Sequence, residues 1–437
     1  MSTARGAAMQ ALVALARGRA DRLREALNTR NLAPRDQAFA FELAHGVVRR
    51  ERLLDHVIAG IVHRGLPKDP QLLTVLRLGA YQLLFVPGMP AHAAVHATVE
   101  LVKGNRGFAN AILRRLADAV LDRAADPAAV TTELPLGPHR ALQLPAPLPS
   151  ELDQRLAIVH SLPDFLLQRF RAQCGDDGLR AIAEAASATP GVFLRASAGV
   201  APAELAAELA RADVATVPTA QARLLQWTGG GSPFATIAFR EGRFVVQDPT
   251  ALAAADAVPC GPGDTVVDLC AAPGTKTTAL AERVRPGGRV IAYDPDSLRR
   301  LRIVDNVTRL RLSDVVTVVA DPVHLPPADA VLADVPCSNT GVLGRRVEVR
   351  SRLLPETFVE LAELQKKLLR QAIALCKPGG TVVYSTCSID REENDDVVAA
   401  VLADPATPPC ERLGSRLTLP TAGVADGGFH ATLRRRG

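Results

Sequence analysis

One strand–turn–helix segment constrains the fold more than any other part of the chain. It spans Val266–Lys276, with the sequence VVDLCAAPGTK. It begins as a short β-branched apolar run, which is typical of a buried parallel strand. Ala271, Ala272 and Gly274 in the turn are small, so the backbone can approach a ligand closely. Thr277–Glu282 then starts a helix, whose first N–H groups favour a negatively charged group. We therefore expect an α/β sheet that holds a nucleotide-like cofactor at this turn.

The same segment departs from two common nucleotide-binding motifs. A phosphate-binding P-loop needs Gly-x4-Gly-Lys-Ser/Thr. Here Thr275 separates Gly274 from Lys276, and Leu269 occupies the position of the first glycine. The dinucleotide motif Gly-x-Gly-x-x-Gly is also missing from the segment. By elimination we expect another adenosine compound, and S-adenosylmethionine is the best candidate. An ordinary βα turn without a ligand is the alternative, and the residues downstream argue against it.

Strands alternate with helical stretches after this turn. The expected strands are 289–294, 315–321, 330–334 and 381–385, and a helix is expected at 355–376. This alternation predicts a Rossmann-like fold with a doubly wound, mostly parallel sheet. Four of the strands end in an acid: Asp268, Asp294, Asp321 and Asp334. Parallel strands present their carboxyl ends at one edge, where α/β sheets bind ligands. Asp294 lies 20 residues beyond Gly274, the distance at which an acid meets ribose hydroxyls, and Asp321 is placed to accept from an adenine amino group.

Seven cysteines, an odd number and widely spaced, argue against a disulfide framework and favour a reducing cytoplasm. No Cys-x2-Cys pair suggests zinc, so we expect no metal. Cys337, in DVPCS, and Cys387, in YSTCS, each follow a strand end. A lone cysteine is usually core packing, but two at equivalent strand tips favour a pair of reactive thiols. Cys270 is expected to pack against the ligand in the turn.

The chain of 437 residues is long enough for several domains. We expect an all-α domain at 1–125, a semi-rigid Pro/Ala-rich linker at 126–160, a small α/β subdomain at 161–240 and the cofactor domain at 241–437. Residues 1–120 contain 17 Lys and Arg against 9 Asp and Glu, a net charge of +8, while the whole chain carries +5. This imbalance suggests a polyanionic partner, although a solvated basic surface would give the same count. No apolar run reaches the ~18 residues of a membrane helix, so we expect a cytoplasmic protein without membrane contact, and a monomer.

Several stretches carry a resemblance to a known family. Arg77–Phe85 and Gly107–Arg115 resemble the NusB-like RNA-binding domain. Asp334–Gly341, DVPCSNTG, and Ser385–Asn394, STCSIDREEN, resemble the Pro-Cys and Thr-Cys motifs of RNA cytosine-5 methyltransferases. Together they resemble the RsmB/Sun family, bacterial enzymes that methylate C5 of cytosine 967 in 16S ribosomal RNA with S-adenosylmethionine. The resemblance runs nearly end to end and finishes at Asp426–Phe429.

The resemblance implies a role for each motif residue. Cys387 would add to C6 of cytosine and Cys337 would assist product release. Asp334 would bond N3 and the N4 amino group, and Lys276 would supply positive potential. The implied cofactor-binding residues are Cys270, Ala271, Ala272, Pro273, Gly274, Thr275, Lys276, Asp294, Asp321 and Asp334.

The chain departs from the family at four positions. Asn339 stands where the family usually has a small residue, and Val347 and Ser351 replace a Pro and a Trp. The family usually has an Asn close after the strand arginine, where this chain has Arg195-Ala196-Ser197. Three alternatives remain: the same reaction on transfer RNA or another ribosomal position, an inactive RNA-binding assembly factor, and DNA cytosine methylation. The intact cysteines and strand-tip acids disfavour the second, and the DNA enzymes share only the Pro-Cys element.

Overall fold

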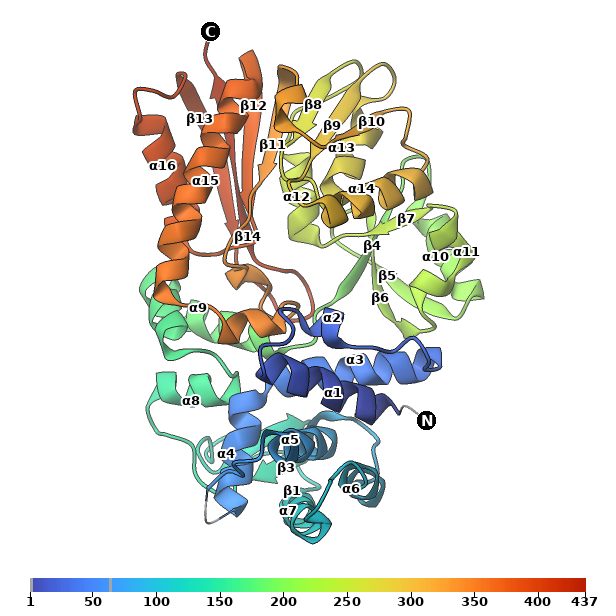
Figure 1. Cartoon of the computed structure of the whole chain (residues 1–437), viewed down its shortest axis with the longest axis vertical. Coiled ribbons are helices and arrows are strands. Elements are labelled where there is room, and N and C mark those ends of the chain that lie inside the picture. The colour runs from blue at the N-terminus through green and yellow to red at the C-terminus, as the bar shows by residue number, and fades with distance from the viewer. Residues whose placement is uncertain (1–2, 63–64) are drawn as a thin grey trace. The chain divides into compact units, whose positions relative to one another are not determined.

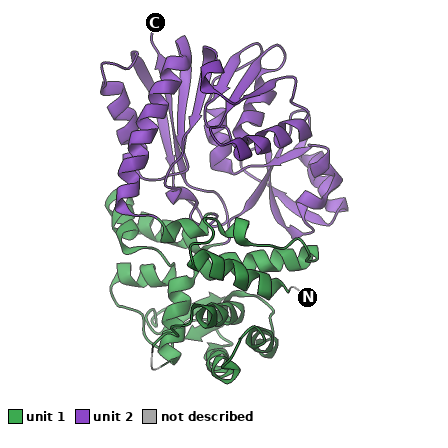
Figure 2. Cartoon of the chain, viewed as in Figure 1, with its two compact units in different colours: residues 1–188, 346–352 green, residues 189–345, 353–437 purple. Residues whose placement is uncertain are grey.

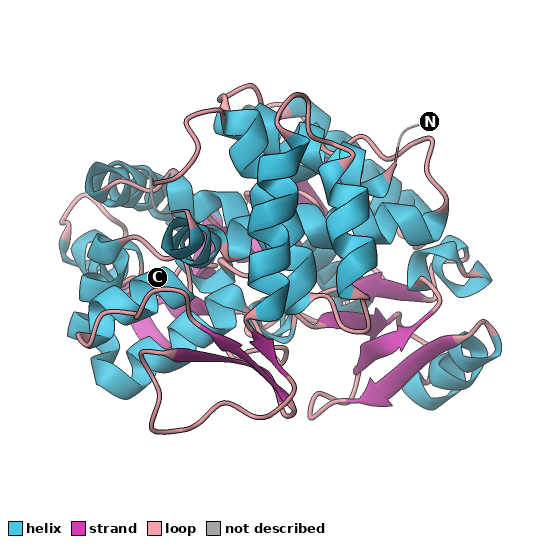
Figure 3. Ribbon diagram, turned by 90° about the horizontal axis from the view of Figure 1, so that it is seen from below, coloured by secondary structure: helices cyan, strands magenta, loops and turns pink. Residues whose placement is uncertain are grey.

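The computed structural model describes residues 3–62 and 65–437, and the chain divides into two compact units (Figure 2). Unit 1 contains residues 1–188 and 346–352, and unit 2 contains residues 189–345 and 353–437. Most of the strands belong to unit 2, whereas unit 1 is largely helical (Figure 3). This division is coarser than the four segments expected from the sequence, whose boundaries, apart from those of the linker, remain a proposal.

Unit 1 begins with the expected helices. Pro70 at the first helical position and the Asp69 carboxylate, which accepts the Gln71 and Leu72 N–H groups, set the start of one of them. Its buried apolar positions, such as Leu76 and Leu83, join one hydrophobic core with those of the other helices. The helices of unit 1 are α1 (Ala4–Ala16), α2 (Leu23–Ala26), α3 (Pro34–Arg49), α4 (Glu51–Ile61), α5 (Pro70–Phe85), α6 (Ala91–Val99), α7 (Arg106–Asp118), α8 (Leu152–Val159) and α9 (Asp164–Ser187).

The segment expected as a linker, 126–160, is folded. It contains two strands of a small antiparallel sheet of order β1-β3-β2, together with α8; the strands are β1 (Val120–Leu121), β2 (Glu133–Gly137) and β3 (Arg140–Gln143). Leu134, Leu142 and Leu144 are buried in the core of unit 1. Pro135 fits because β2 is an edge strand, where a missing N–H costs little. The linker prediction was therefore wrong. The leucines spaced along this segment are buried in a hydrophobic core, and this burial folds the segment despite its high proline content.

A short segment that follows the Pro-Cys motif belongs to unit 1. Val347 joins the core of that unit. The buried Arg350 guanidinium donates to the carbonyl oxygens of Arg49 at 3.1 Å, His160 at 2.9 Å and Ala186 at 2.6 Å, where α3, α8 and α9 end. Unpaired carbonyls at helix C-termini carry partial negative charge, which favours a cation. Burial, with the charges of nearby arginines, lowers the pKa of Arg350 to about 9, so it stays charged at neutral pH.

Unit 2 contains a four-stranded sheet of order β5-β6-β4-β7, flanked by α10 (Pro202–Arg211) and α11 (Ile237–Arg240). Arg195, on the central strand β4, is fully buried. Its guanidinium lies 2.5 Å from the Glu282 carboxylate and donates to Thr278 Oγ1 at 3.0 Å. Arg195 thus ties this sheet to the helix that follows residues 270–274, the turn at which the sequence predicts a cofactor; this segment is called the cofactor turn below. The strands are β4 (Val192–Ala196), β5 (Val214–Pro218), β6 (Leu224–Gly230) and β7 (Phe244–Val246).

The larger sheet of unit 2 has seven strands in the order β10-β9-β8-β11-β12-β14-β13. The first five are mutually parallel, and β14 and β13 add antiparallel pairs at one end. The parallel strands match the predicted ones, except that β12 begins five residues earlier than expected. The strands are β8 (Thr265–Asp268), β9 (Arg289–Tyr293), β10 (Val316–Val319), β11 (Ala328–Asp334), β12 (Cys376–Thr386), β13 (Cys410–Thr418) and β14 (Gly428–Arg435).

Helices cover both faces of this sheet (Figure 1). The helices are α12 (Pro249–Asp256), α13 (Thr275–Val284), α14 (Ser297–Arg309), α15 (Pro355–Leu375) and α16 (Asp395–Ala403). Successive strand residues divide between two hydrophobic clusters, because strand side chains alternate between faces. Val267 and Val331 pack with α15 and α16, whereas Val266 and Leu332 pack with α13 and α14. The predicted doubly wound Rossmann-like fold is therefore confirmed.

Two further features of the described residues are relevant to function. None of the helices there is long and apolar enough to cross a membrane. Across residues 3–62 and 65–437, no group of three or more His, Cys, Asp or Glu side chains lies close enough together to hold a metal ion.

Candidate active site

The carboxyl ends of the parallel strands of unit 2 bring the predicted residues to one edge of the sheet. Asp268 on β8 pairs in register with Leu332 on β11, and Asp334 on β11 pairs with Ser385 on β12. Cys387 therefore emerges beside the segment that carries Cys337. Residues far apart in the sequence meet here because parallel strands share one direction.

Lys276 and Asp334 form an ion pair at this edge. Lys276, in the first turn of α13, places Nζ 2.6 Å from Asp334 Oδ2. Burial opposes the charge of Lys276, but the Asp334 carboxylate more than offsets it, so the pKa of Lys276 is raised. Cys387 adds to that effect. Lys276 is thus held as a cation within electrostatic reach of the Cys387 sulfur.

The two predicted cysteines lie together. Cys337 Sγ is 3.0 Å from Cys387 Sγ. Cys337 is buried, while Cys387 is half-buried. The hydrogen bond to Cys387, burial and the nearby Glu393 charge raise the pKa of the Cys337 thiol well above its usual range. Cys337 is therefore held as a thiol.

A buried polar network fixes the loops that carry these thiols. Glu393 accepts the Ser338 N–H at 2.8 Å and the Gln365 amide at 2.9 Å. Thr340 Oγ1 and Ser388 Oγ lie 2.9 Å apart. Satisfied polar networks in a low dielectric hold loops rigidly. The spacing of the two thiols is therefore set by the segments on which they lie.

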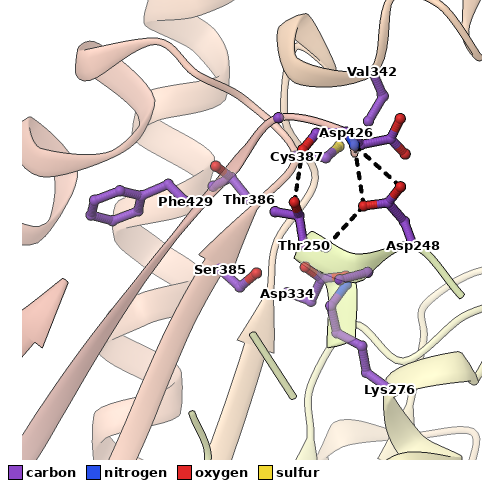
Figure 4. Close-up of a pocket in the computed structure, with 12 residues that line it drawn as sticks. Asp248, Thr250, Lys276, Asp334, Val342, Ser385, Thr386, Cys387, Asp426 and Phe429 are labelled. Atoms are coloured by element: carbon purple, nitrogen blue, oxygen red, sulfur yellow. Dashed lines mark hydrogen bonds and ion pairs between the residues drawn. The ribbon is translucent and has the colours of Figure 1, made fainter. Parts of the chain in front are cut away.

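Cys387 lines a pocket together with Lys276 and Asp334 (Figure 4). Figure 4 shows the Lys276 and Asp334 side chains directed toward one another on one side of it. Other lining residues come from the start of α12 and from the loop before β14: Asp248, Thr250, Asp426 and Gly427. The pocket thus combines a thiol, a cation and several carboxylates.

The sequence prediction omitted the acids on the second side of the pocket. Arg345 donates to Asp426 Oδ2 at 2.5 Å and to Asp248 Oδ2 at 3.1 Å. Burial and the neighbouring Asp248 charge raise the pKa of Asp426 to about 7. Thr250 Oγ1 donates to the Asp426 carbonyl at 2.7 Å. No local pattern signalled this cluster, although Asp426 lies in the Asp-Gly-Gly-Phe stretch noted above.

Glycines allow three loops of the site to approach one another. The Gly341 N–H donates to the Cys387 carbonyl at 2.9 Å, and the Gly427 N–H donates to the Gly341 carbonyl at 2.8 Å. A Cβ on Gly341 would meet the Gly427 carbonyl oxygen at 2.4 Å. Only glycine fits there, so the loop before β14 helps to position Cys387.

The cofactor turn has the geometry expected from its small residues. Gly274 caps α13 with a φ of +98°, a conformation that favours glycine. Asp268 is fully buried and accepts from Thr277 Oγ1 at 2.7 Å. Burial raises the pKa of Asp268 to about 7, against that hydrogen bond. Its second oxygen, Oδ1, has no hydrogen-bond partner within the described part of the chain.

The two remaining acids differ in their surroundings. Asp294 is buried beside the turn, accepts the Ala272 N–H at 3.2 Å and the Asp296 N–H at 3.1 Å, and lies 3.3 Å from Arg299. Oδ1, which accepts the Asp296 N–H, retains a lone pair, so a ribose hydroxyl can still be bound. Asp321 is exposed and accepts the N–H two residues ahead. Within residues 3–62 and 65–437, no hydrogen bond or ion pair joins Asp321 to the other predicted site residues.

Comparison with known proteins matches two separate parts of the sequence to known families. Residues 257–414 match the family described as 16S rRNA methyltransferase RsmB/F, and residues 2–118 match the NusB family. A probable ribosomal RNA small subunit methyltransferase B of Synechocystis is 33% identical, over 87% of this chain and 83% of its own. Ribosomal RNA small subunit methyltransferase B of Thermus thermophilus is 32% identical, over 92% of this chain and 89% of its own.

The chain belongs to the RsmB/F family. It is therefore an RNA methyltransferase with a NusB-family domain in front. The RsmB/F match contains β8 to β12 and both Cys337 and Cys387, and the NusB match covers α1 to α7. The family resemblance found in the sequence is confirmed.

Solved structures agree on the fold of this RsmB/F chain. The crystal structure of PH0851 covers 99% of this chain and 98% of its own, with a TM-score of 0.74 at 24% identity. A methyltransferase homologue from Pyrococcus horikoshii covers 62% of this chain and 95% of its own, with a TM-score of 0.55 at 25% identity.

Proposed function

We propose that this chain methylates C5 of a cytosine in RNA, with S-adenosylmethionine as methyl donor, through a covalent bond between Cys387 and C6. The observation that carries the proposal is the pair of thiols 3.0 Å apart, with Cys387 lining a pocket beside Lys276 and Asp334. The expected target is 16S ribosomal RNA, at a position of the cytosine-967 type. This part rests on the family and on the motif resemblance rather than on geometry.

The pair of thiols fits the chemistry that methylation of cytosine C5 requires. Cytosine C5 is too weak a carbon nucleophile to attack a methyl sulfonium unaided. When the Cys387 thiolate adds to C6, the C5–C6 double bond is lost and C5 becomes enamine-like. After C5 has taken the methyl group, loss of its proton expels the thiolate and restores the ring. The target base must leave its stack to reach such a pocket.

The chain's charged groups fit the assigned roles. Lys276, held as a cation by Asp334, would stabilise the Cys387 thiolate. Asp334 would form hydrogen bonds with N3 and with the N4 amino group of the target cytosine, and would so select cytosine over uracil. Cys337, held as a thiol, would assist product release.

The cofactor turn fits S-adenosylmethionine. Bound there, the cofactor would supply an electrophilic methyl group. Residues 270–276 would contact it through small side chains and backbone, because Gly274 and its neighbours leave the backbone accessible. The first N–H groups of α13 favour its carboxylate. Asp294 would bind the ribose and Asp321 the adenine.

Unit 1 would contribute RNA binding. Its first 120 residues carry a net charge of +8, and phosphates bind Lys and Arg through Coulomb attraction and counterion release. The same chemistry on transfer RNA or another ribosomal position is the alternative substrate. Bisulfite sequencing of ribosomal and transfer RNA from a deletion strain distinguishes these substrates. The target is the cytosine that resists bisulfite conversion in the wild type and is converted in the deletion strain.

Two cysteine variants test the covalent step. Cys387→Ala should abolish methylation and form no covalent complex with RNA, yet still bind cofactor. Cys337→Ala should attack and transfer methyl but release product slowly, so that enzyme stays joined to RNA. A denaturing gel after incubation with RNA and S-adenosylmethionine should therefore show a slow-migrating band for Cys337→Ala only.

The matched control is Cys260→Ala, a cysteine outside the pocket lining. It should turn over normally and give no band. A band for Cys387→Ala instead would show that the roles are exchanged. Full turnover in both variants would exclude a covalent mechanism and make the cysteines structural.

A further inference from the structure

The Asn339 side chain contacts both cysteine loops. Cys387 Sγ donates to Asn339 Oδ1 at 3.3 Å, and Asn339 Nδ2 donates to the Cys337 backbone carbonyl at 2.7 Å. Its backbone has a φ of +63°, in the left-handed region that Asn tolerates better than most residues. This conformation turns the amide back toward the residue two positions earlier.

The Cys337 carbonyl fixes which end of the amide faces Cys387. A carbonyl oxygen only accepts hydrogen bonds, so Nδ2 must point toward it. A flipped amide would place two acceptor oxygens 2.7 Å apart without a proton between them. Oδ1, which is an acceptor, is therefore the atom that faces the Cys387 sulfur.

This orientation sets the direction of the hydrogen bond between the thiols. Cys387 has one S–H, and Asn339 Oδ1 takes it. The contact of 3.0 Å between the two sulfurs then requires the proton of Cys337. The chain of donors thus runs from Cys337 to Cys387 to Asn339.

We propose that Asn339 is a positioning residue that sets this direction, so that the Cys337 S–H points at the Cys387 sulfur while the Asn339 acceptor restrains the ionisation of Cys387. When Cys387 loses its proton to solvent, the Cys337 S–H already points at the sulfur that becomes anionic. A hydrogen bond to an ion is stronger than one between neutral groups, so the Cys387 thiolate is stabilised while Cys337 stays a thiol. The raised pKa of Cys337 agrees with this order.

The inference deepens the proposed function, because it rests on Cys387 being the nucleophile. The acceptor also has a cost, since a bond to Oδ1 stabilises the neutral thiol and is broken on ionisation. Asn339 therefore aligns the Cys337 S–H with the Cys387 sulfur and, at the same time, reduces the fraction of Cys387 that is ionised.

Other charged groups act on the same sulfur atoms. Lys276 on α13, Asp334 on β11, Asp248 before α12 and Asp426 before β14 line the pocket with Cys387, and Glu393 acts on Cys337. A neutral substitution of Asn339 leaves all of them unchanged. The effect of the amide can therefore be measured separately from theirs.

The test measures the reactivity of each thiol in the full-length protein, without RNA or cofactor. Iodoacetamide labelling from about pH 6 to about pH 10, a range that brackets the ordinary thiol pKa, gives a rate profile for each cysteine when read by peptide mass spectrometry. Asn339→Gly suits the positive φ and removes the amide. It should lower the pH midpoint of the Cys387 labelling profile by about 0.5–1 unit, which corresponds to the free energy of one neutral hydrogen bond. Asn339→Asp adds a negative charge at the same place and should raise the midpoint.

Labelling of Cys260 in the same samples is the internal control and should not change. The selectivity of labelling for Cys387 over Cys337 should also rise in Asn339→Gly, because the variant removes an acceptor from the Cys387 thiol and none from the Cys337 thiol. Equal midpoints in all three proteins, or shifts of the same sign in both variants, would overturn the inference. Turnover by Cys387→Ala would instead overturn the proposed function and leave these midpoints unaffected, so the two failures are distinguishable.

Discussion

Lys276 Nζ lies 2.6 Å from Asp334 Oδ2, and this ion pair joins the helix after the cofactor turn to the strand that leads into the Pro-Cys loop. The side chains are 15% and 30% exposed, so water screens the pair only in part. The charge at the first turn of α13 and the charge at the tip of β11 are therefore coupled. A change in either residue alters the charge felt by Cys387.

The first prediction concerns the charge of Lys276. Lys276→Met removes the cation that favours a Cys387 thiolate and leaves Asp334 without its partner. We expect kcat/KM for RNA methylation to fall about 10- to 100-fold, the equivalent of ~1.5–3 kcal/mol. The pH–rate profile should also move to higher pH, because more hydroxide is needed to ionise the thiol. Lys276→Arg, which keeps the charge, should retain the wild-type profile, and an identical profile in Lys276→Met would contradict the assignment.

The second prediction concerns cofactor binding. Asp294→Ala removes a proposed ribose contact and also the acceptor that holds the Ala272 N–H in the turn. Calorimetric titration with S-adenosylmethionine should show a loss of ~1.5–3 kcal/mol in binding free energy. Asp305→Ala, an exposed acid on α14, should bind normally. Unchanged affinity in Asp294→Ala would remove this residue from the site.

The third prediction concerns the basic helix α7. Arg106, Arg114 and Arg115 are exposed on it. Reversing all three to Glu should weaken RNA binding and reduce the slope of log affinity against log salt by ~0.7–0.9 for each phosphate that the helix no longer neutralises. These substitutions are preferable to deletion of residues 1–120, because Val347 packs in the core of unit 1 and the deletion would remove its partners.

The control for α7 is Lys367→Glu, an exposed basic residue on α15 in unit 2. It should leave affinity and salt slope near the wild-type values. If the triple variant binds RNA with the same affinity and slope as the wild type, α7 is not part of the RNA surface.

The fourth prediction concerns the pH dependence of stability. Burial raises the pKa of Asp268 to about 7, so the folded state binds its proton more tightly than the unfolded chain does. The stability that this group contributes is fully present below the unfolded pKa of about 3.9 and is lost as pH rises through about 7. Between about pH 5 and about pH 8, the free energy of unfolding measured in urea should fall by about 2–3 kcal/mol more for the wild type than for Asp268→Asn. Parallel stability curves for the two proteins would mean that Asp268 titrates normally.

Much of the fold follows from local patterns. The strand that ends at Asp268 was predictable because a short β-branched apolar run followed by small residues has few other solutions. The helix α5 also agrees with a local pattern, because it ends at Phe85, just before the pair Pro87 and Gly88. The linker at 126–160 was predicted wrongly, because composition does not report that Leu134 and Leu142 are buried against helices earlier in the chain.

Sequence alone determined the family motifs, the doubly wound sheet and the strand tips on which Cys337, Cys387 and Asp334 lie, since each depends on residues close together in the chain. Tertiary structure alone decided which side chains meet. The two cysteines are 50 residues apart and Asp248 and Asp426 are 178 apart, yet each pair is in hydrogen-bond contact. The orientation of Asn339 likewise depends on a backbone carbonyl and a sulfur from two different loops. Such contacts follow from how the elements of unit 2 bring distant loops to one edge of the sheet, which no local pattern encodes.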